Sequence, residues 1–251
     1  MLSPCSPPKP CRRIYGPASL ARRADLEGLL TRHGAGERLE RHRHADAYIA
    51  ITISGSYFEA GDDGRVRASP GTVIVHDAHS AHRDNFGARG AIVLNLPALN
   101  GLTGAGTIAD ADAVAKAAER DLREAVSLVA EQFQPALLSP GDWPDLLARD
   151  LARNPDLQIS NWADSAGLDP ASVSRGFAKA FGVTPKRYRL EARARRAIAA
   201  LNSWQGSLAT IAAEQGFADQ SHFTRTVRDL TGATPQLLKA KSVQSGTRCC
   251  R

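Results

Sequence analysis

The chain has 251 residues, of which 43% are hydrophobic and 23% charged, a composition typical of a folded protein of one or two domains. Its longest apolar run, Tyr48 to Ile53, is far shorter than the roughly 20 residues of a membrane-spanning helix, so the sequence predicts no membrane contact. The cysteines stand at positions 5, 11, 249 and 250, near the two ends, which excludes a disulfide-built secreted domain and favours the cytoplasm.

The net charge of +6 is distributed unevenly along the chain. Residues 1–150 contain 17 basic and 19 acidic side chains, whereas residues 151–251 contain 15 basic and only 7 acidic ones. Clustered lysines and arginines neutralise phosphates and release their counterions, so the second part is expected to meet a polyanion. A basic surface that merely aids solubility is the alternative.

The first 100 residues divide into an arm and a β-rich module. Residues 1–24 carry five prolines, four arginines and no acid, which predicts a disordered arm; an organellar transit peptide is the alternative, but the prolines would break its helix. Short β-branched runs then alternate with Gly, Pro and Asp turns. The runs are 48–53, 57–58, 65–67, 72–75 and 91–96. A small β-barrel within residues 25–100 is therefore expected.

Residues 101–135 read as a linker followed by one long helix. Apolar residues recur every three or four positions from Val114 to Phe133, which predicts a single amphipathic helix over 112–134. Its stripe either packs on its own barrel or on the same helix of a second subunit, which makes it a candidate dimerisation helix of a homodimer. A Pro/Gly-rich linker over 135–144 precedes helices at 144–240, and residues 241–251 are expected to be a disordered tail.

An internal repeat is the strongest signal in the helical part. The segment Val173 to Phe177, followed by Gly182, Thr184 and Pro185, recurs fifty residues later as Phe223 to Val227, followed by Gly232, Thr234 and Pro235. Upstream segments 162–167 and 211–216 also correspond. Each copy predicts helix, glycine turn, helix, with Asp169 and Asp219 as N-caps of the second helices. The second helix of each copy, called a reading helix below, is expected to be joined to the other by a helix over 186–202.

Each second helix presents hydrogen-bonding side chains outward if its Val and Phe face inward. Such a helix reads base edges in the major groove of double-stranded DNA, with arginine the commonest partner of guanine. The predicted DNA-binding residues are Ala171, Ser172, Ser174, Arg175, Lys179, Gln220, Ser221, Thr224, Arg225 and Arg228. His222 is expected either to touch a phosphate or to pack locally.

Residues 144–240 resemble the tandem helix-turn-helix domain of AraC/XylS-type transcription regulators, above all from Gly216 to Arg225. The resemblance implies base-facing positions at Ala171, Ser174 and Arg175 and at Gln220, Ser221, Thr224 and Arg225. It also implies RNA polymerase as a partner. Gly176 departs from the pattern within the first reading helix, where glycine costs about 1 kcal/mol relative to alanine. Fewer or weaker contacts are therefore expected from the first copy.

Six of the seven histidines lie between positions 33 and 82. Gly36, the pair His42 and His44, and His82 after Gly71 resemble the signature segments of cupins, which implies a barrel whose imidazoles share one cavity. Strand alternation puts His42 and His44 on one face, and neutral imidazoles suit divalent Zn, Fe, Ni or Cu. The expected metal ligands are His42, His44 and His82. Asp46, Tyr48, His76 or His79 are candidates to complete the metal's coordination sphere. The alternatives are a small-molecule effector site lined by His42, His44, Tyr48, His76 and His82, or ordinary partly exposed histidines.

The fold class expected from these observations is α+β in two domains, a cupin-like antiparallel β-barrel followed by an all-α tandem helix-turn-helix domain. We expect a DNA-binding transcription regulator that responds to a small effector, without enzymatic activity. The alternative is a metal-dependent cupin enzyme with an appended helical domain. Only the regulator predicts specific and steeply salt-dependent duplex binding.

Overall fold

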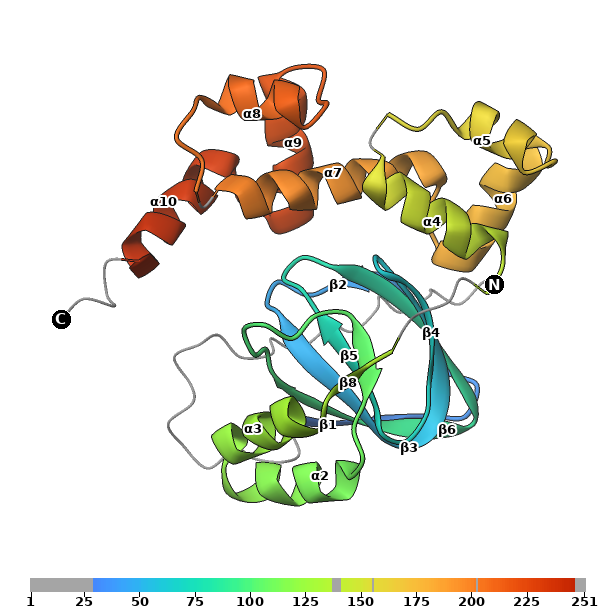
Figure 1. The fold of residues 1–251 in the computed structure, drawn as a ribbon, viewed down its shortest axis with the longest axis vertical. Coiled ribbons are helices and arrows are strands. Elements are labelled where there is room, and N and C mark those ends of the chain that lie inside the picture. Colours follow the sequence, from blue (N-terminus) through green and yellow to red (C-terminus); the bar gives the residue numbers. More distant parts are fainter. Residues whose placement is uncertain (1–28, 137–140, 155, 202, 247–251) are drawn as a thin grey trace, which may run out of the picture.

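The computed structural model describes residues 29–136, 141–154, 156–201 and 203–246, so the arm predicted for residues 1–24 lies outside its description. The chain forms two lobes: a β-barrel with two helices against it, and a helical layer that lies across one end of the barrel (Figure 1). Within the described residues, no helix combines the length and the hydrophobicity needed to cross a membrane.

The sheet is antiparallel in all its pairings, as predicted. Its strands are β1 (Leu30–His33), β2 (Arg38–Arg43), β3 (Tyr48–Gly61), β4 (Gly64–Ala68), β5 (Thr72–His76), β6 (Ala81–Pro97), β7 (Ala105–Thr107) and β8 (Gln134–Pro135). The long strands β3 and β6 pair with each other, β1 and β2 add to β6, and β4 and β5 add to β3. Because β7 and β8 extend the sheet beyond β5, the β-module ends at Pro135 and not near residue 100.

Glycines allow the bend in the two long strands. Gly55 and Gly90 have φ values of 76° and 66°, in the left-handed region that other residues rarely adopt. A Cβ on Gly55 would lie 2.0 Å from the carbonyl oxygen of Gly90. The pairing of β3 with β6 shifts register on either side of this point, so the strands bend where their backbones touch.

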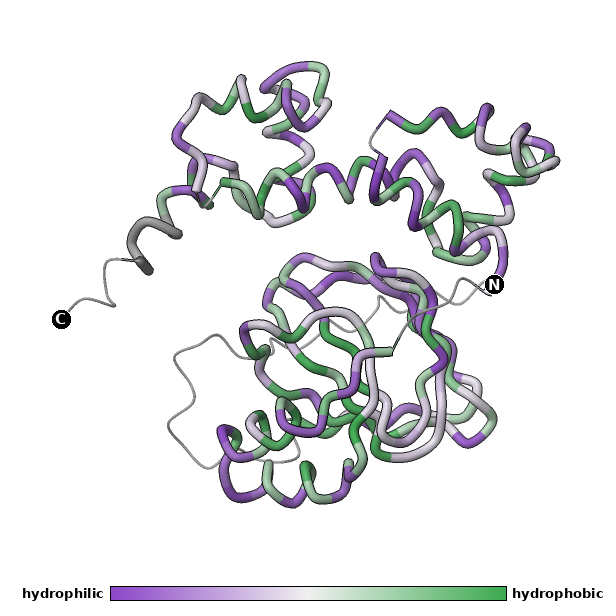
Figure 2. Tube along the Cα trace, viewed as in Figure 1, coloured by the Kyte–Doolittle hydropathy of each residue, from purple (hydrophilic) through white to green (hydrophobic). Residues whose placement is uncertain are grey.

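Strand β3 buries both of its faces in its first five residues, 48–52. Ile49 and Ile51 pack in one core with Val73, Leu94 and the helices that cover the barrel, whereas Tyr48 and Ala50 point into a second core inside the barrel. This explains why Tyr48 to Ile53 reads as a continuous apolar run and not as a polar alternation. The hydrophobic stretches of the barrel strands are visible in Figure 2.

The single helix predicted over 112–134 is wrong, because the chain forms α2 (Ala111–Arg120) and α3 (Leu122–Gln132). The break is at Asp121, whose backbone is extended (φ −152°, ψ 119°) and whose side chain caps α3 by accepting from the Arg123 N–H at 2.8 Å. The apolar stripe is folded onto the barrel, where Val114 and Val129 are fully buried. Of the two partners that the sequence left open, the stripe packs on its own barrel.

The remaining chain is helical, with α7 at its centre. Its helices are α4 (Trp143–Arg153), α5 (Ile159–Ser165), α6 (Pro170–Phe181), α7 (Pro185–Leu201), α8 (Leu208–Glu214), α9 (Gln220–Thr231) and α10 (Pro235–Gly246). Helix α7 packs against α4, α6, α9 and α10 and joins two separate cores, one at each end. Because α10 continues to Gly246, the tail predicted to start at residue 241 is wrong for its first six residues, and residues 247–251 lie outside the description.

Candidate functional site

Both predicted helix-turn-helix copies are present, as α5–α6 and α8–α9. Asp169 accepts from the Ser172 N–H at 2.8 Å, and Asp219 accepts from the His222 N–H at 2.6 Å, so each second helix has the predicted N-cap. Each also ends on a left-handed glycine, Gly182 or Gly232, with φ of 71° and 74°. Local chemistry therefore fixes the same start and the same end in both copies.

The reading helices bury the side chains that the sequence assigned to the interior. Phe177 and Phe223 have no exposed surface, and Val173 and Val227 are at most 1% exposed. All the predicted DNA-binding residues are exposed or partly exposed, on α6 at Ala171, Ser172, Ser174, Arg175 and Lys179 and on α9 at Gln220, Ser221, Thr224, Arg225 and Arg228. The outward placement agrees with the prediction, and the contact with bases remains a prediction.

The arginines of α7 are used within the protein. Arg189 donates to the carbonyl of Leu157, Arg193 to that of Gly216, and Arg196 to that of Ala152. The carbonyls of Ala152 and Gly216 lie at the C-terminal ends of α4 and α8, where backbone acceptors lack intrahelical donors, and that of Leu157 lies in the connection between α4 and α5. These three arginines of α7 thus hold the helices of this lobe together.

Gly176 is required by packing, which the sequence did not show. A Cβ at this position would lie 2.6 Å from the ring of Trp143, the residue that begins α4. The glycine therefore lets an indole lie against the reading helix. His222 packs locally, with its ring edge against Phe217 at a centroid distance of 5.4 Å.

Three histidines converge on one point inside the barrel, as predicted. The Nε2 atom of His82 lies 2.9 Å from Nε2 of His42 and 3.3 Å from Nε2 of His44. Nδ1 of His42 lies 2.9 Å from the carbonyl oxygen of Glu40. In the tautomer protonated at Nδ1, this nitrogen donates to that carbonyl, and the lone pair of Nε2 faces the other two histidines. We call His42, His44 and His82 the histidine cluster.

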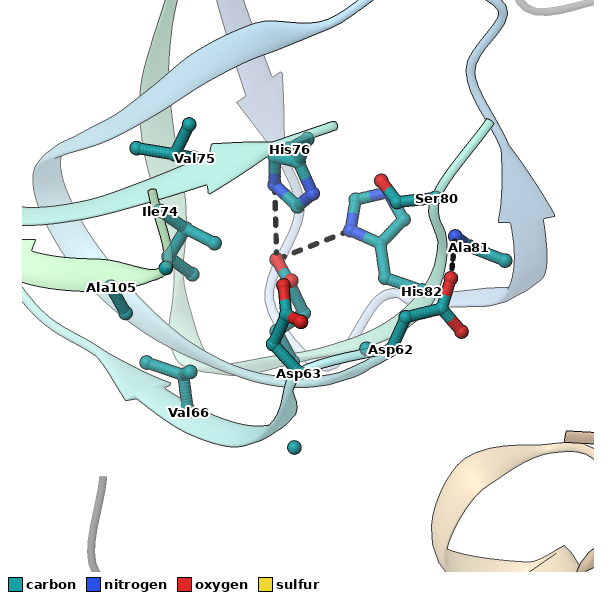
Figure 3. A pocket seen from close by; sticks show the side chains of 14 residues that line it. Asp62, Asp63, Val66, Ile74, Val75, His76, Ser80, Ala81, His82 and Ala105 are labelled. Carbon is teal, nitrogen blue, oxygen red and sulfur yellow. Dashed lines mark hydrogen bonds and ion pairs between the residues drawn. The ribbon is translucent and has the colours of Figure 1, made fainter. Parts of the chain in front are cut away.

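A buried carboxylate behind His82 was missed by the sequence analysis. Oε2 of Glu59 lies 3.2 Å from Nδ1 of His82 and 3.6 Å from Nε2 of His76. In Figure 3 the dashed lines from the labelled His76 and His82 mark these two contacts and end on the carboxylate of Glu59, which carries no label there. The available signal was alternation along β3, which puts Glu59 on the same buried face as Tyr57.

Of the four other residues that the sequence suggested for this site, two lie at the histidine cluster and two do not. Tyr48 is buried, with its ring stacked on His76 at 4.4 Å and its edge toward His44. Asp46 is exposed, and His79 lies in a turn with φ of 65°, where its backbone bonds to His44 and Arg43. The structure brings Tyr48 and His76 to the cluster and not Asp46 or His79.

The environment favours the neutral form of the imidazoles. Burial, reinforced by the charge of neighbouring His82, lowers the pKa of His42 to about 4 and that of His44 to about 4. Burial also raises the pKa of Glu59 to about 8 and that of Asp84, near His82, to about 7. The buried Nδ1 of His82, Nε2 of His76 and Oε2 of Glu59 lack a well-directed hydrogen bond. Such atoms mark a site that a ligand or proton completes.

A small cavity adjoins the cluster and is lined by Glu59, Asp62, Asp63, His76 and His82, among others. Its free volume of about 20 Å³ is space for little more than one water molecule. An occupant of this cavity in the present arrangement is therefore ion-sized or water-sized.

Comparison with known proteins agrees with this geometry in the helical part. Residues 162–241, about a third of the chain, match the family model described as "Helix-turn-helix domain". The matched residues include both copies, α5–α6 and α8–α9, so the C-terminal lobe contains a tandem helix-turn-helix domain. A search of curated proteins finds no match to the chain.

Solved structures give three examples of similarity. An AraC-type transcriptional regulator from Chromobacterium violaceum is 27% identical, with 39% of this chain and 89% of that chain covered and a TM-score of 0.37. A DNA-binding transcriptional dual regulator from Escherichia coli K-12 is 18% identical, with coverages of 44% and 99% and a TM-score of 0.39. ToxT from Vibrio cholerae is 9% identical, with coverages of 83% and 96% and a TM-score of 0.38.

Proposed function

We propose that this protein is a sequence-specific transcription regulator whose helical lobe binds double-stranded DNA and whose barrel senses a small effector. The observation that carries the proposal is the pair of capped reading helices, α6 and α9, with polar outward faces at the two ends of α7. Two such helices on one rigid support are suited to adjacent major grooves.

Duplex binding by the full chain tests the proposal. A preferred duplex is first selected from a random pool, and its affinity is then measured by fluorescence anisotropy at several salt concentrations. We expect Arg225→Ala to weaken specific binding by about 1–3 kcal/mol, because one bidentate contact to a base is worth that much. Arg120→Ala, an exposed arginine of α2, is the matched control. Equal duplex affinities for the parent, Arg225→Ala and Arg175→Ala would show that these two arginines do not contribute to DNA binding.

We further propose that the effector is a divalent transition-metal ion held by the histidine cluster. The three Nε2 atoms and their neutral state fit such an ion, and Glu59 behind His82 resembles the carboxylates that orient metal-binding imidazoles. A bound ion would supply a fixed positive charge that ties β2 to β6. The small cavity beside His82 has no room for an organic molecule in the present arrangement.

Metal content tests the second proposal. Mass spectrometry of untagged protein, reconstituted separately with Zn, Fe, Ni and Cu, is expected to find near-stoichiometric metal in the parent and a loss of at least tenfold in a His42→Ala/His44→Ala variant. Asp46→Ala is the control, because its side chain lies outside the cluster. Equal metal content in all three proteins would exclude the cluster as the site. An enzyme with the same metal would lack selective duplex binding, which separates it from a regulator.

Assembly and location remain predictions. Of the stripe considered for dimerisation, Leu122, Val126 and Phe133 are only partly buried, and the other members are buried against the barrel: Val114, Ala118, Ala125 and Val129. A homodimer, contact with RNA polymerase and a cytoplasmic location are all expected of a regulator. A single monomeric species in sedimentation velocity across the working concentration range would exclude the homodimer.

A further inference from the structure

We propose that metal binding at the histidine cluster and docking of the DNA-binding lobe on the barrel are a single coupled equilibrium. The coupling rests on the proposed metal site and is carried by residues that alternate with the histidines on the same strands. Polar contacts between the barrel and α7 connect the two lobes and involve Arg41, Asp62, Tyr188, Glu191 and Arg195.

Strand β2 carries the first connection. Side chains at successive positions of a strand point to opposite faces, so the sequence Arg41-His42-Arg43-His44 puts the histidines on one face and the arginines on the other. The arginines meet α7 of the other lobe, where Glu191 lies 3.3 Å from Arg41 and 3.0 Å from Arg43. One segment thus faces the cluster on one side and the DNA-binding lobe on the other.

Strand β6 repeats the arrangement. His82 belongs to the cluster, and its neighbour Arg83 donates to the carbonyl of Lys179 at 3.0 Å, in the last turn of reading helix α6. On β3, Glu59 lies behind His82, while the next residue, Ala60, is buried in the core formed by α4, α6 and α7. Each of the three strands therefore connects a residue at the cluster with a neighbour at the other lobe.

Asp62 joins these connections at one buried point. Its side chain is 3% exposed, and its carboxylate lies 2.5 Å from Arg41 and 2.6 Å from Arg195 of α7. The same carboxylate accepts the Ala81 N–H at 2.7 Å, and its backbone carbonyl accepts the Tyr188 hydroxyl at 2.6 Å. Asp62 therefore holds the immediate neighbours of His42 and His82 while it is held by α7.

A buried ionic network has discrete arrangements and does not deform continuously. When the lobes separate, Asp62 loses Arg195 and Tyr188, and the positions of Arg41 and Ala81 are no longer fixed from both sides. The docked lobe therefore holds His42 and His82 in the arrangement in which their Nε2 atoms lie 2.9 Å apart. Linkage is reciprocal, so an ion bound there favours docking by the same factor.

A substitution on α7 tests the coupling without touching the barrel. Zn²⁺ affinity of the full chain is measured by competition with a chromophoric chelator in the parent and in Arg195→Met. We expect the variant to bind Zn²⁺ about five- to tenfold more weakly, within the usual range of coupling between sites. Arg196→Met is the matched control, because Arg196 is one residue away on the same helix and donates within its own lobe. It is expected to stay within about twofold of the parent.

A milder variant and a reciprocal measurement complete the test. Tyr188→Phe removes only the hydroxyl that bonds to Asp62, so it keeps the coupling testable if Arg195→Met does not fold, and it should weaken Zn²⁺ binding in the same direction. In the parent, Zn²⁺ is also expected to change the affinity for a selected duplex by a factor different from one, and by linkage the duplex changes the affinity for Zn²⁺ by the same factor. Equal Zn²⁺ affinity in parent and all variants would overturn the coupling and leave the metal site standing. A parent that binds no Zn²⁺ but binds DNA would overturn both the metal site and the coupling and leave DNA binding intact.

Discussion

Gly176 shows at the scale of one residue how packing can reverse a helix-propensity argument. An interior glycine weakens an isolated helix, yet this one provides the space that the Trp143 indole occupies against α6. The first reading helix is thus supported from behind by an aromatic ring, so the glycine does not by itself weaken the first copy.

Gly176→Ala is expected to destabilise the protein by about 1–3 kcal/mol, because the strain of an overpacked core exceeds the gain in helix propensity. Urea unfolding followed by circular dichroism measures the change. In a Trp143→Ala background the clash is gone, so the same substitution should become neutral or stabilising. A stabilising effect in the parent background would contradict the proposed contact.

The buried imidazoles predict a pH dependence for the metal-free protein. The pKa of His42 and that of His44 are lowered to about 4 in the folded chain, mainly by burial, from an ordinary value of 6.5. Between these values the unfolded chain binds more protons, so their contribution is present above pH 6.5 and is lost as the pH falls toward 4. We expect the urea midpoint to fall from pH 7 to pH 5 more steeply in the parent than in a His42→Gln/His44→Gln variant. Parallel pH profiles would show that neither imidazole is protonated less readily after folding.

At the scale of elements, capping decides where the helices begin. Asp121 divides one apolar stripe into α2 and α3, and Asp169 and Asp219 start the two reading helices. A capping carboxylate accepts from backbone N–H groups that have no partner in the first turn. Both the error over 112–134 and the successful placement of α6 and α9 come from this one interaction.

Asp219→Ala should cost about 1 kcal/mol of stability, and Asp219→Asn should retain most of the cap, because the amide oxygen also accepts the His222 N–H. Thermal unfolding of both variants measures the difference. Asp229→Ala, on an exposed position of the same helix, is expected to change stability by less than about 0.5 kcal/mol. A similar loss from Asp219→Asn and Asp219→Ala would exclude the cap as the cause.

At the scale of the whole molecule, the lobes are joined by polar contacts, some of them buried, as well as by apolar packing. Arg65 of β4 pairs with Asp142 and Asp145 at the start of α4, and Tyr188 of α7 reaches the backbone of Asp62. Buried donors and acceptors must find partners, so such contacts favour one relative position of the two lobes.

Tyr188→Phe should lower the free energy of unfolding by about 1–3 kcal/mol, because it leaves the buried Asp62 carbonyl without its hydroxyl donor. The tryptophans lie at positions 143, 162 and 204, so their fluorescence reports on the helical lobe alone, whereas circular dichroism reports on both lobes. We expect the two urea transitions to move apart in the variant if the hydroxyl helps the lobes to unfold together. A loss below about 0.5 kcal/mol would show that the contact contributes little.

The sequence alone determined the elements whose causes are local. Caps, glycine turns and inward Val and Phe positions fixed both helix-turn-helix copies and their outward residues, and strand alternation placed His42 and His44 on one face. Only the tertiary structure decided what the stripe of α2 and α3 covers, why Gly176 is tolerated, and that Glu59 stands behind His82. These features depend on contacts between residues far apart in the chain, for which periodicity and capping give no signal. The contacts of Asp62 with α7 are of the same kind, because they form only when the two lobes meet.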